Sequence, residues 1–197
     1  MRGFTLVEII ITIIILSVVV GALLPAYNNF SDTLRLRRAA QEVALTLREA
    51  QASAIAVKGY DDDANPATPL VFKPWGVFYP LTGSDVFYTL FVDLNNNQSY
   101  DAPNPDGPAP LGEKVKFLSL INYNVRFKNL CARLRTGTVA DDICTLSRID
   151  VLYQRPNPDT ILKGDGIIYP DVEIILENTR GKTLMVVVWA SGQVTVE

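Results

Sequence analysis

The chain begins with one long apolar stretch. From Phe4 to Leu24 the only charged residue is Glu8, and this run is 21 residues long. As a helix it would measure about 31 Å, at roughly 1.5 Å per residue, which matches the hydrocarbon core of a bilayer. The pattern therefore predicts a transmembrane or assembly helix over residues 4–24.

Past Pro25 the pattern becomes amphipathic. Apolar residues recur at steps of three and four, and charged residues fill much of the remaining surface. Asp32 and Arg35 have the spacing of a surface ion pair. We expect a helical arm over 25–58 that ends at Gly59. The apolar positions of the arm include Tyr27, Phe30, Leu34, Val43, Leu47, Ala50, Ala54 and Val57.

The remainder of the chain, residues 59–197, has the alternation and the β-branched and aromatic content of strands. The segment 172–189 has the pattern of a hairpin, with its turn around Gly181. We therefore predict an α+β fold, in which a long N-terminal helix packs on an antiparallel β-sheet head. The expected strands are 75–79, 86–92, 114–117, 124–127, 148–153, 172–176, 183–189 and 193–196.

Three ordinary explanations exist for the apolar start. A cleaved secretory signal peptide would have a longer basic region, a shorter apolar core and a small-residue cleavage site, none of which is present. A buried core helix seldom runs this far without polar residues. A plain single-pass anchor is the serious alternative, but it leaves Glu8 unexplained because a carboxylate in a membrane span is costly unless it is paired.

The run Gly3-Phe4-Thr5-Leu6-Val7-Glu8, followed by the apolar stretch, resembles the N-terminal signal of type IV pilins and type II secretion pseudopilins. The resemblance implies that a membrane-embedded prepilin peptidase removes a leader, residues 1–3, by cutting between Gly3 and Phe4. The same enzyme would then methylate the new amine of Phe4. Pro25 stands where many pilins carry a proline. The partners implied are this peptidase, other pilin or pseudopilin subunits, and the membrane.

Cleavage gives Glu8 a suitable partner. The nitrogen of Phe4 is a neutral amide in the precursor and becomes a positively charged amine after cleavage. Opposite charges that pair in a low-dielectric setting interact strongly, while either one alone is penalised. We therefore interpret Glu8 as an assembly residue that pairs with the Phe4 amine of a neighbouring subunit.

Weaker motifs resemble the GspH/FimT group of minor pseudopilins. They are the arm sequences 38–42 and 47–52, the segments 91–97 and 111–113, and the C-terminal segment 191–194. The expected protein is a minor pilin or pseudopilin of a type IV pilus or a type II secretion (protein secretion) filament. It would sit in the cytoplasmic membrane with an extracytoplasmic head, and on the filament or cell surface after assembly.

The charge is divided unevenly along the chain. Residues 1–58 carry a net charge of +2 and residues 59–197 carry −5, within a total of −3. Arg35, Arg37 and Arg38 follow the apolar run, while only Arg2 and the amino terminus precede it. By the positive-inside rule this distribution would place the head in the cytoplasm, although large domains translocate largely regardless of charge. The prepilin resemblance implies the opposite orientation, and we adopt that one.

The chain has no histidine, so the commonest general base and metal ligand are missing. No nucleophile has a base beside it in the sequence, which argues against an enzyme. Cys131 and Cys144 are too few for a zinc site. If the head is exported, a disulfide between them is the favoured interpretation, and two buried free thiols are the alternative.

The segment 93–101 presents oxygen side chains at alternate positions, as calcium-binding loops do. The ligands would be Asp93, Asn95, Asn97 and Asp101. However, Gln98 stands where such a loop needs glycine, and no glutamate follows at the twelfth position. A polar turn between two strands is the favoured interpretation. We therefore expect no cofactor, with calcium as the alternative.

A basic region surrounds the cysteines. The function that it suggests is a pilus-tip module that binds extracellular DNA or surfaces, which we keep as the alternative to the structural role. An ordinary solvated surface explains the same residues, so DNA is not favoured as a partner. The sequence leaves secretion, adhesion, motility and DNA uptake open. The basic residues are Arg126, Lys128, Arg133, Arg135 and Arg148.

Overall fold

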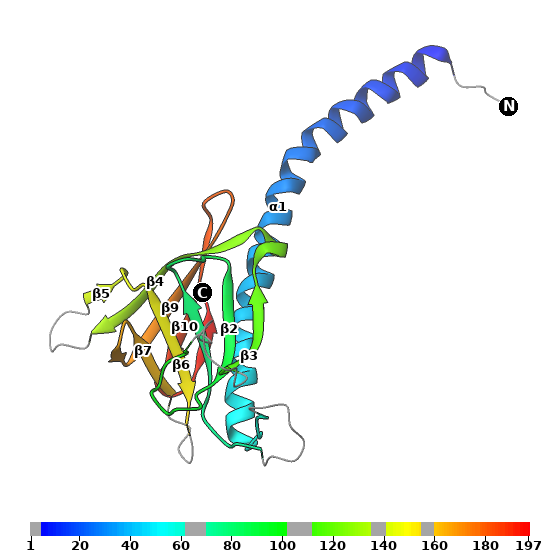
Figure 1. Cartoon of the computed structure of the whole chain (residues 1–197). Coiled ribbons are helices and arrows are strands. Elements are labelled where there is room, and N and C mark those ends of the chain that lie inside the picture. Colours follow the sequence, from blue (N-terminus) through cyan, green and yellow to red (C-terminus); the bar gives the residue numbers. More distant parts are fainter. Residues whose placement is uncertain (1–4, 62–69, 102–111, 135–140, 155–159) are drawn as a thin grey trace.

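The protein consists of one very long helix and a β-rich head (Figure 1). The computed structural model describes residues 5–61, 70–101, 112–134, 141–154 and 160–197, apart from the side chains of 22–29, 134, 141 and 142. Helix α1 spans Leu6–Ile55, 50 residues, and continues through Pro25. Its first half projects from the molecule and its second half lies along the head.

Helix α1 begins and ends with defined caps. Thr5 is the N-cap, and its hydroxyl accepts a hydrogen bond from the Glu8 amide at 3.3 Å. At the other end Val57 adopts a left-handed conformation (φ 57°), which is rare for a β-branched residue. The prediction that Gly59 ends the helix is wrong by one turn. Gly59 serves a different purpose, because a Cβ there would lie 2.7 Å from the Cβ of Leu70.

In the described part of the chain the head has two antiparallel sheets rather than one. The first has six strands in the order β3-β2-β1-β6-β7-β8, and the second has five in the order β11-β10-β9-β4-β5. The first contains β1 (Trp75–Pro80), β2 (Phe87–Val92), β3 (Lys114–Ser119), β6 (Arg148–Tyr153), β7 (Thr160–Gly164) and β8 (Ile167–Tyr169). The second contains β4 (Val125–Leu134), β5 (Asp141–Ile143), β9 (Asp171–Asn178), β10 (Thr183–Trp189) and β11 (Val194–Val196). A short 3-10 helix, η1 (Ile121–Tyr123), connects β3 to β4.

One core joins the helix to both sheets. The second half of α1 contacts β1 and β6 of the first sheet and β9, β10 and β11 of the second. Its buried face includes Leu36, Val43 and Leu47, each at most 2% exposed. Alternate residues of the strands complete this core, as expected for sheets with one covered face. The head therefore buries one face of the second half of α1, whereas residues 6–21 are exposed.

The predicted fold class, α+β with a long helix on an antiparallel head, is confirmed. The hairpin of β9 and β10 pairs over its full length, from Thr183 with Glu177 to Trp189 with Asp171. The sequence did not predict strands β5, β7 and β8. These strands have three, five and three residues, too few for a clear alternating pattern.

Candidate functional site

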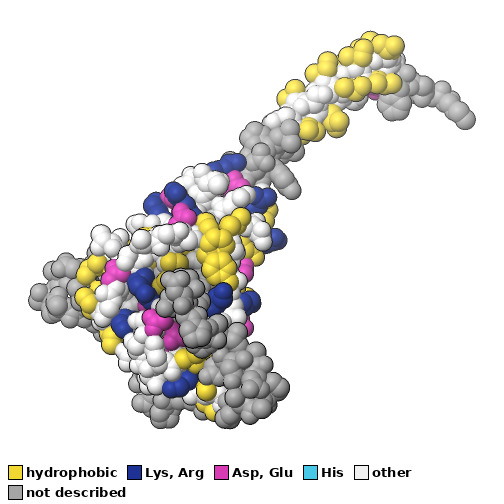
Figure 2. Space-filling view, in the orientation of Figure 1, with side chains coloured by type: hydrophobic (Ala, Val, Ile, Leu, Met, Phe, Trp, Pro, Cys, Tyr) yellow, Lys and Arg dark blue, Asp and Glu magenta, His cyan; other side chains and the backbone are white. Residues whose placement is uncertain are grey.

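Residues 6–21 of α1 are exposed and carry apolar side chains on every side of the helix. Figure 2 shows hydrophobic groups, with white groups between them, on the part of this helix that is coloured. Leu6, Ile13 and Leu16 are 74%, 58% and 66% exposed, and the other large apolar residues up to Val20 are similar. Two polar side chains bond to the helix backbone, because the hydroxyls of Thr12 and Ser17 each donate to a carbonyl one turn earlier, at 2.8 Å. A surface this apolar requires an apolar covering.

Glu8 is the one charged residue of this half. It stands three residues after the N-cap Thr5, which is the spacing of a capping box. Its backbone amide donates the hydrogen bond that caps the start of the helix. Its side chain is exposed. Gly3 and Phe4, where cleavage is predicted, lie outside the described residues. The predicted roles of Gly3, Phe4 and Glu8 stay predictions.

The membrane segment predicted over 4–24 extends past the described side chains at both ends and stays a prediction. Within the residues that the structure describes, none of the helices combines the length and the apolar character needed to cross a bilayer. Pro25 lies inside α1, and its predicted role in assembly stays a prediction.

Cys131 and Cys144 are brought together in the second sheet. Cys131 lies on β4, opposite Glu173 of β9, and Cys144 follows β5 directly. Their sulfurs form a disulfide that spans 13 positions of the sequence. This bond attaches the short edge strand β5 to the longest strand of its sheet. Its presence in the mature protein stays a prediction that peptide mapping tests.

The four predicted calcium ligands also lie close together. Asp93 is buried, and its two carboxylate oxygens accept hydrogen bonds from the amides of Asn97 and Gln98, at 3.1 and 2.9 Å. The side-chain amides of Asn95 and Asn97 both donate to one oxygen of Asp101, at 2.7 and 2.6 Å. These groups therefore satisfy one another within the loop, as a polar turn does.

A further carboxylate that sequence reasoning missed, Glu113, reaches the same loop. Its two oxygens accept from the amides of Leu94 and Asp101, at 3.2 and 2.7 Å. Burial raises the pKa of Glu113, and the nearby charges of Asp101 and Asp93 raise this pKa further. Eleven residues separate Glu113 from Asp101 in the sequence, so the sequence pattern did not indicate that the two are in contact.

This convergence of carboxylates does not amount to a metal centre. Among the described residues, no three histidine, cysteine, aspartate or glutamate side chains are arranged to hold a metal ion. The loop is instead attached to the first sheet, because the amide of Tyr100 donates to buried Asp150 at 2.9 Å and Arg148 pairs with the same carboxylate. Calcium binding stays a prediction.

The basic region predicted around the cysteines is dispersed and neutralised. Arg126 and Lys128 both pair with Glu177, at 2.9 and 2.8 Å, and Arg133 pairs with Glu173 at 2.6 Å. Arg148 belongs to the other sheet and pairs with Asp150, while Arg135 lies outside the described residues. The acidic partners come from β9 and β6, and those on β9 are 40 or more positions away in the sequence. The sequence pattern therefore overestimated the free positive charge.

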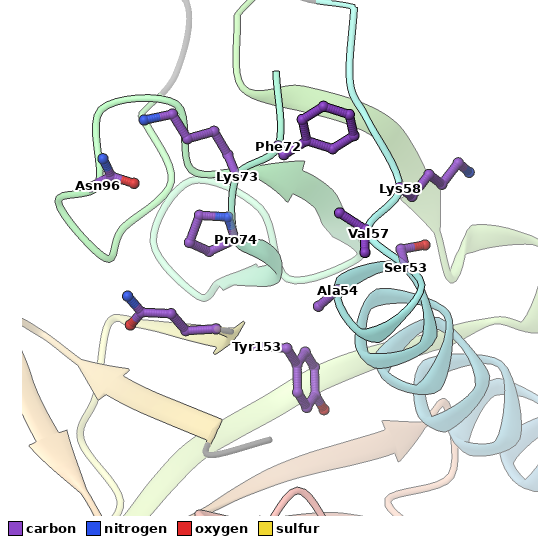
Figure 3. A pocket seen from close by; sticks show the side chains of 10 residues that line it. Ser53, Ala54, Val57, Lys58, Phe72, Lys73, Pro74, Asn96 and Tyr153 are labelled. Atoms are coloured by element: carbon purple, nitrogen blue, oxygen red, sulfur yellow. The ribbon is translucent and has the colours of Figure 1, made fainter. Parts of the chain in front are cut away.

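A cavity of about 310 Å³ opens at the C-terminal end of α1 (Figure 3). Lys58 and Lys73 line it, but their amino groups extend in opposite directions, and Lys58 lies 5.2 Å from the centre of the Trp75 ring. Its other lining residues include Ser53, Asn96 and Tyr153, with no carboxylate or thiol among them. The lining offers no nucleophile with a base, so this cavity does not suggest catalysis.

Comparison with known proteins bears on the N-terminus alone. The family model for the prokaryotic N-terminal methylation motif matches residues 1–24. No curated protein and no solved structure matches the chain. The motif supports a type IV pilin-like protein that is a substrate of prepilin peptidase, and it suggests a structural subunit rather than an enzyme. The α+β arrangement of α1 on its head is consistent with this assignment.

Proposed function

We propose that the protein is a filament subunit, a minor pilin or pseudopilin of a type IV pilus or type II secretion system. Prepilin peptidase removes residues 1–3 and methylates the amine of Phe4. Residues 4–24 hold the subunit in the cytoplasmic membrane, with the head on the extracytoplasmic side, and later pack among the helices of other subunits. The head occupies the outside of the filament and the cell surface.

The observation that carries this proposal is the coincidence of two features in one segment. The methylation motif matches residues 1–24, and the same segment includes the part of α1 that no element of the head covers. A helix that is apolar all round is stable only inside lipid or among other apolar helices. A filament subunit uses both environments in turn, first the membrane and then the bundle of neighbouring helices.

Glu8 sets the register between neighbouring helices when the subunit moves from the membrane into the filament. Before cleavage, the charge of Glu8 has no cationic neighbour at the same depth. After cleavage, the Phe4 amine of one subunit pairs with the Glu8 carboxylate of the next, and the low dielectric of the surroundings strengthens the attraction. If neighbouring helices slide out of register, the pair is broken. Each charge then remains in the apolar bundle without a partner, which is unfavourable.

The head supports a structural role better than binding of DNA. Each described cation of the region around the cysteines has a carboxylate partner within 3 Å. Affinity for nucleic acid depends on cations that are available to neutralise phosphates. The membership of the GspH/FimT group and the specific filament remain parts of the proposal.

Mass spectrometry of the protein extracted from membranes tests the proposed function. In a strain with active prepilin peptidase, the mature chain should begin at Phe4 and carry one added methyl group. The variant Gly3→Val should remain as uncleaved precursor, because the peptidase site is expected to admit little side chain at this position. Gly21→Val is the matched control, since a Cβ at Gly21 meets nothing within 4 Å, and it should be cleaved normally.

An intact N-terminus in this strain would contradict the proposed processing. Equal cleavage of Gly3→Val and the native chain would place the cut elsewhere. Extraction of the native chain by alkaline carbonate would contradict membrane insertion through residues 4–24.

A further inference from the structure

Five cations surround α1 at the point where it enters the head. Arg35, Arg37 and Arg38 are exposed on the helix. The tip of the β9–β10 hairpin adds two more, because Arg180 Nε lies 2.6 Å from Asp32 and Lys182 Nζ donates to the hydroxyl of Thr33 at 3.2 Å. The predicted pairing of Asp32 with Arg35 is replaced by this contact with the hairpin. We call these five residues the basic collar: Arg35, Arg37, Arg38, Arg180 and Lys182.

The basic collar encloses the helix on all sides. Successive helical residues are rotated by about 100°, so Arg37 and Arg38 lie about 200° and 300° around the helix from Arg35. The hairpin is attached at residues 32 and 33, which lie about 60° and 160° from Arg35, so it occupies the sector between Arg35 and Arg37. Figure 2 shows basic groups, with acidic groups among them, where the helix leaves the head. A ring of charge perpendicular to a helix fits a flat surface that the helix crosses.

The distances suit a membrane surface. Arg35 follows Leu24, the end of the apolar run, by 11 residues, or about 16 Å along the helix. The headgroup layer accounts for about 6 Å of this, and arginine side chains on a helix lean back toward its N-terminus. This leaves about 10 Å of helix between Arg35 and the headgroup layer, and the backward lean of the side chain brings the guanidinium to a distance comparable with the Debye length of about 8 Å at physiological ionic strength. The collar therefore lies within electrostatic reach of lipid phosphates.

The charge balance favours this end of the head alone. The five cations of the collar face two carboxylates, Asp32, which pairs with Arg180, and Glu42, one helical turn beyond Arg38, so the charge of this end stays positive. The segment 59–197 as a whole carries a net charge of −5, so an anionic surface repels the rest of the head. Attraction at one end and repulsion elsewhere would orient the head upright on the membrane.

We propose that the basic collar docks the head onto anionic lipid headgroups of the outer leaflet of the cytoplasmic membrane. This proposal rests on the proposed function, because it needs residues 4–24 in the bilayer. It also explains arginines that the positive-inside rule places on the wrong side. Their positive charge is used after translocation, to hold the subunit at the height from which its helix enters the filament.

The test uses the full-length protein reconstituted in two kinds of vesicle, purely zwitterionic or containing about 30% anionic phospholipid. An amine-reactive reagent, read out by mass spectrometry, measures the labelling rate of each lysine. Anionic lipid should slow the labelling of Lys182 about threefold, and 0.5 M salt, which shortens the Debye length to about 4 Å, should restore it. Lys114 and Lys116, exposed on β3, serve as internal references whose rates should not change.

Two triple variants assign the effect to the collar. Replacement of Arg35, Arg37 and Arg38 by glutamine should abolish the protection of Lys182. The matched control replaces Arg48, Lys58 and Lys116, which are also exposed but lie outside the collar, and should keep the protection, with Lys114 remaining as the reference. Thermal unfolding of each variant verifies that the head remains folded.

Equal labelling of Lys182 in both vesicles, or equal loss of protection in both triple variants, would overturn the proposal. Protection that depends on the protein-to-lipid ratio but not on the anionic lipid would assign the collar to contacts between subunits, and would overturn it as well. Extraction with alkaline carbonate distinguishes failure of the collar proposal from failure of the proposed function. A chain that resists extraction but shows no protection contradicts the collar alone, whereas a chain that is extracted contradicts the proposed function too.

Discussion

The two halves of α1 belong to one continuous helix, yet different surroundings shape their sequences. Residues 36–54 bury one face against two sheets, and Leu47 in this half is completely buried. Residues 6–21 are exposed throughout, and Leu16 in that half is 66% exposed. The second half is therefore apolar on one side, and the first on all sides.

This difference shows which surroundings determine the pattern of apolar and polar residues in each half of α1. The second half is specified by its own head, so its pattern follows from the fold of a single chain. Under the proposed function, the first half is specified by lipid and by other subunits, which a single chain does not contain. Substitutions in the second half should change stability, and substitutions in the first should change assembly.

The largest effect is expected from a leucine in the buried half. Leu47→Ala should lower the free energy of unfolding of the head by about 4 kcal/mol, because it removes buried carbon and leaves a cavity between the sheets. Leu16→Ala makes the same chemical change in the exposed half and should leave that free energy unchanged. Chemical denaturation of the detergent-solubilised protein measures both. Similar losses in the two variants would contradict the division of α1.

The disulfide is expected to contribute somewhat less, about 3 kcal/mol, through the loop that it closes in the unfolded chain. The double variant Cys131→Ala, Cys144→Ala should lose this amount from the head without affecting cleavage after Gly3. Peptide mapping without reducing agent establishes the bond in protein from the native envelope. Free thiols on both residues in that material would count against both the disulfide and the extracytoplasmic orientation.

The sequence predicted elements with long patterns and missed features made by distant contacts. The helix, the hairpin around Gly181 and the longer strands have enough residues to display their period. The end of α1 was misplaced because glycine is the usual left-handed residue, whereas here Val57 takes that conformation.

The candidate sites repeat this lesson. The sequence correctly grouped Asp93 with Asp101, which are neighbours along the chain. It missed Glu113, which reaches the same loop from beyond the interval 102–112. It also grouped cations such as Arg126 without the acidic residues of β9 that neutralise them. Chemistry local to the sequence was predictable, and chemistry across strands was not.

Glu8 gives the next comparison, within the exposed half of α1. Glu8→Leu should reduce incorporation of the subunit into filaments at least tenfold, the equivalent of about 1.4 kcal/mol, through loss of the pair with a neighbour's Phe4 amine. Insertion and cleavage should persist. The measurement is the fraction of subunit in sheared or cross-linked filaments relative to total membrane subunit.

Glu8→Gln separates charge from capping. Glutamine fits a capping box with Thr5 as well as glutamate does, so the start of the helix is preserved while the charge is removed. If charge pairing sets the register, this variant should assemble as poorly as Glu8→Leu. If only the cap matters, it should assemble normally. Equal incorporation of the native chain and both variants would refute both explanations.

The smallest effect concerns Glu177, a glutamate whose partners lie within the same chain. Hydrogen bonds from Lys128 and Arg126 lower the pKa of Glu177 below its ordinary value of 4.5. A carboxylate with a lowered pKa in the folded state stabilises the fold above its unfolded pKa, and this contribution is lost as the pH falls through the folded pKa. Glu177→Gln should therefore be less stable than the native head at pH 7, and the difference should be smaller at pH 3, below the ordinary pKa of 4.5. Glu49→Gln, at an exposed position on α1, should follow the native curve at both pH values.

A difference between Glu177→Gln and the native head that persists undiminished at pH 3 would mean that packing, not charge, makes Glu177 important. Glu177, whose charged partners lie in the same chain, could then no longer be compared with Glu8, whose proposed partner lies on a neighbouring subunit.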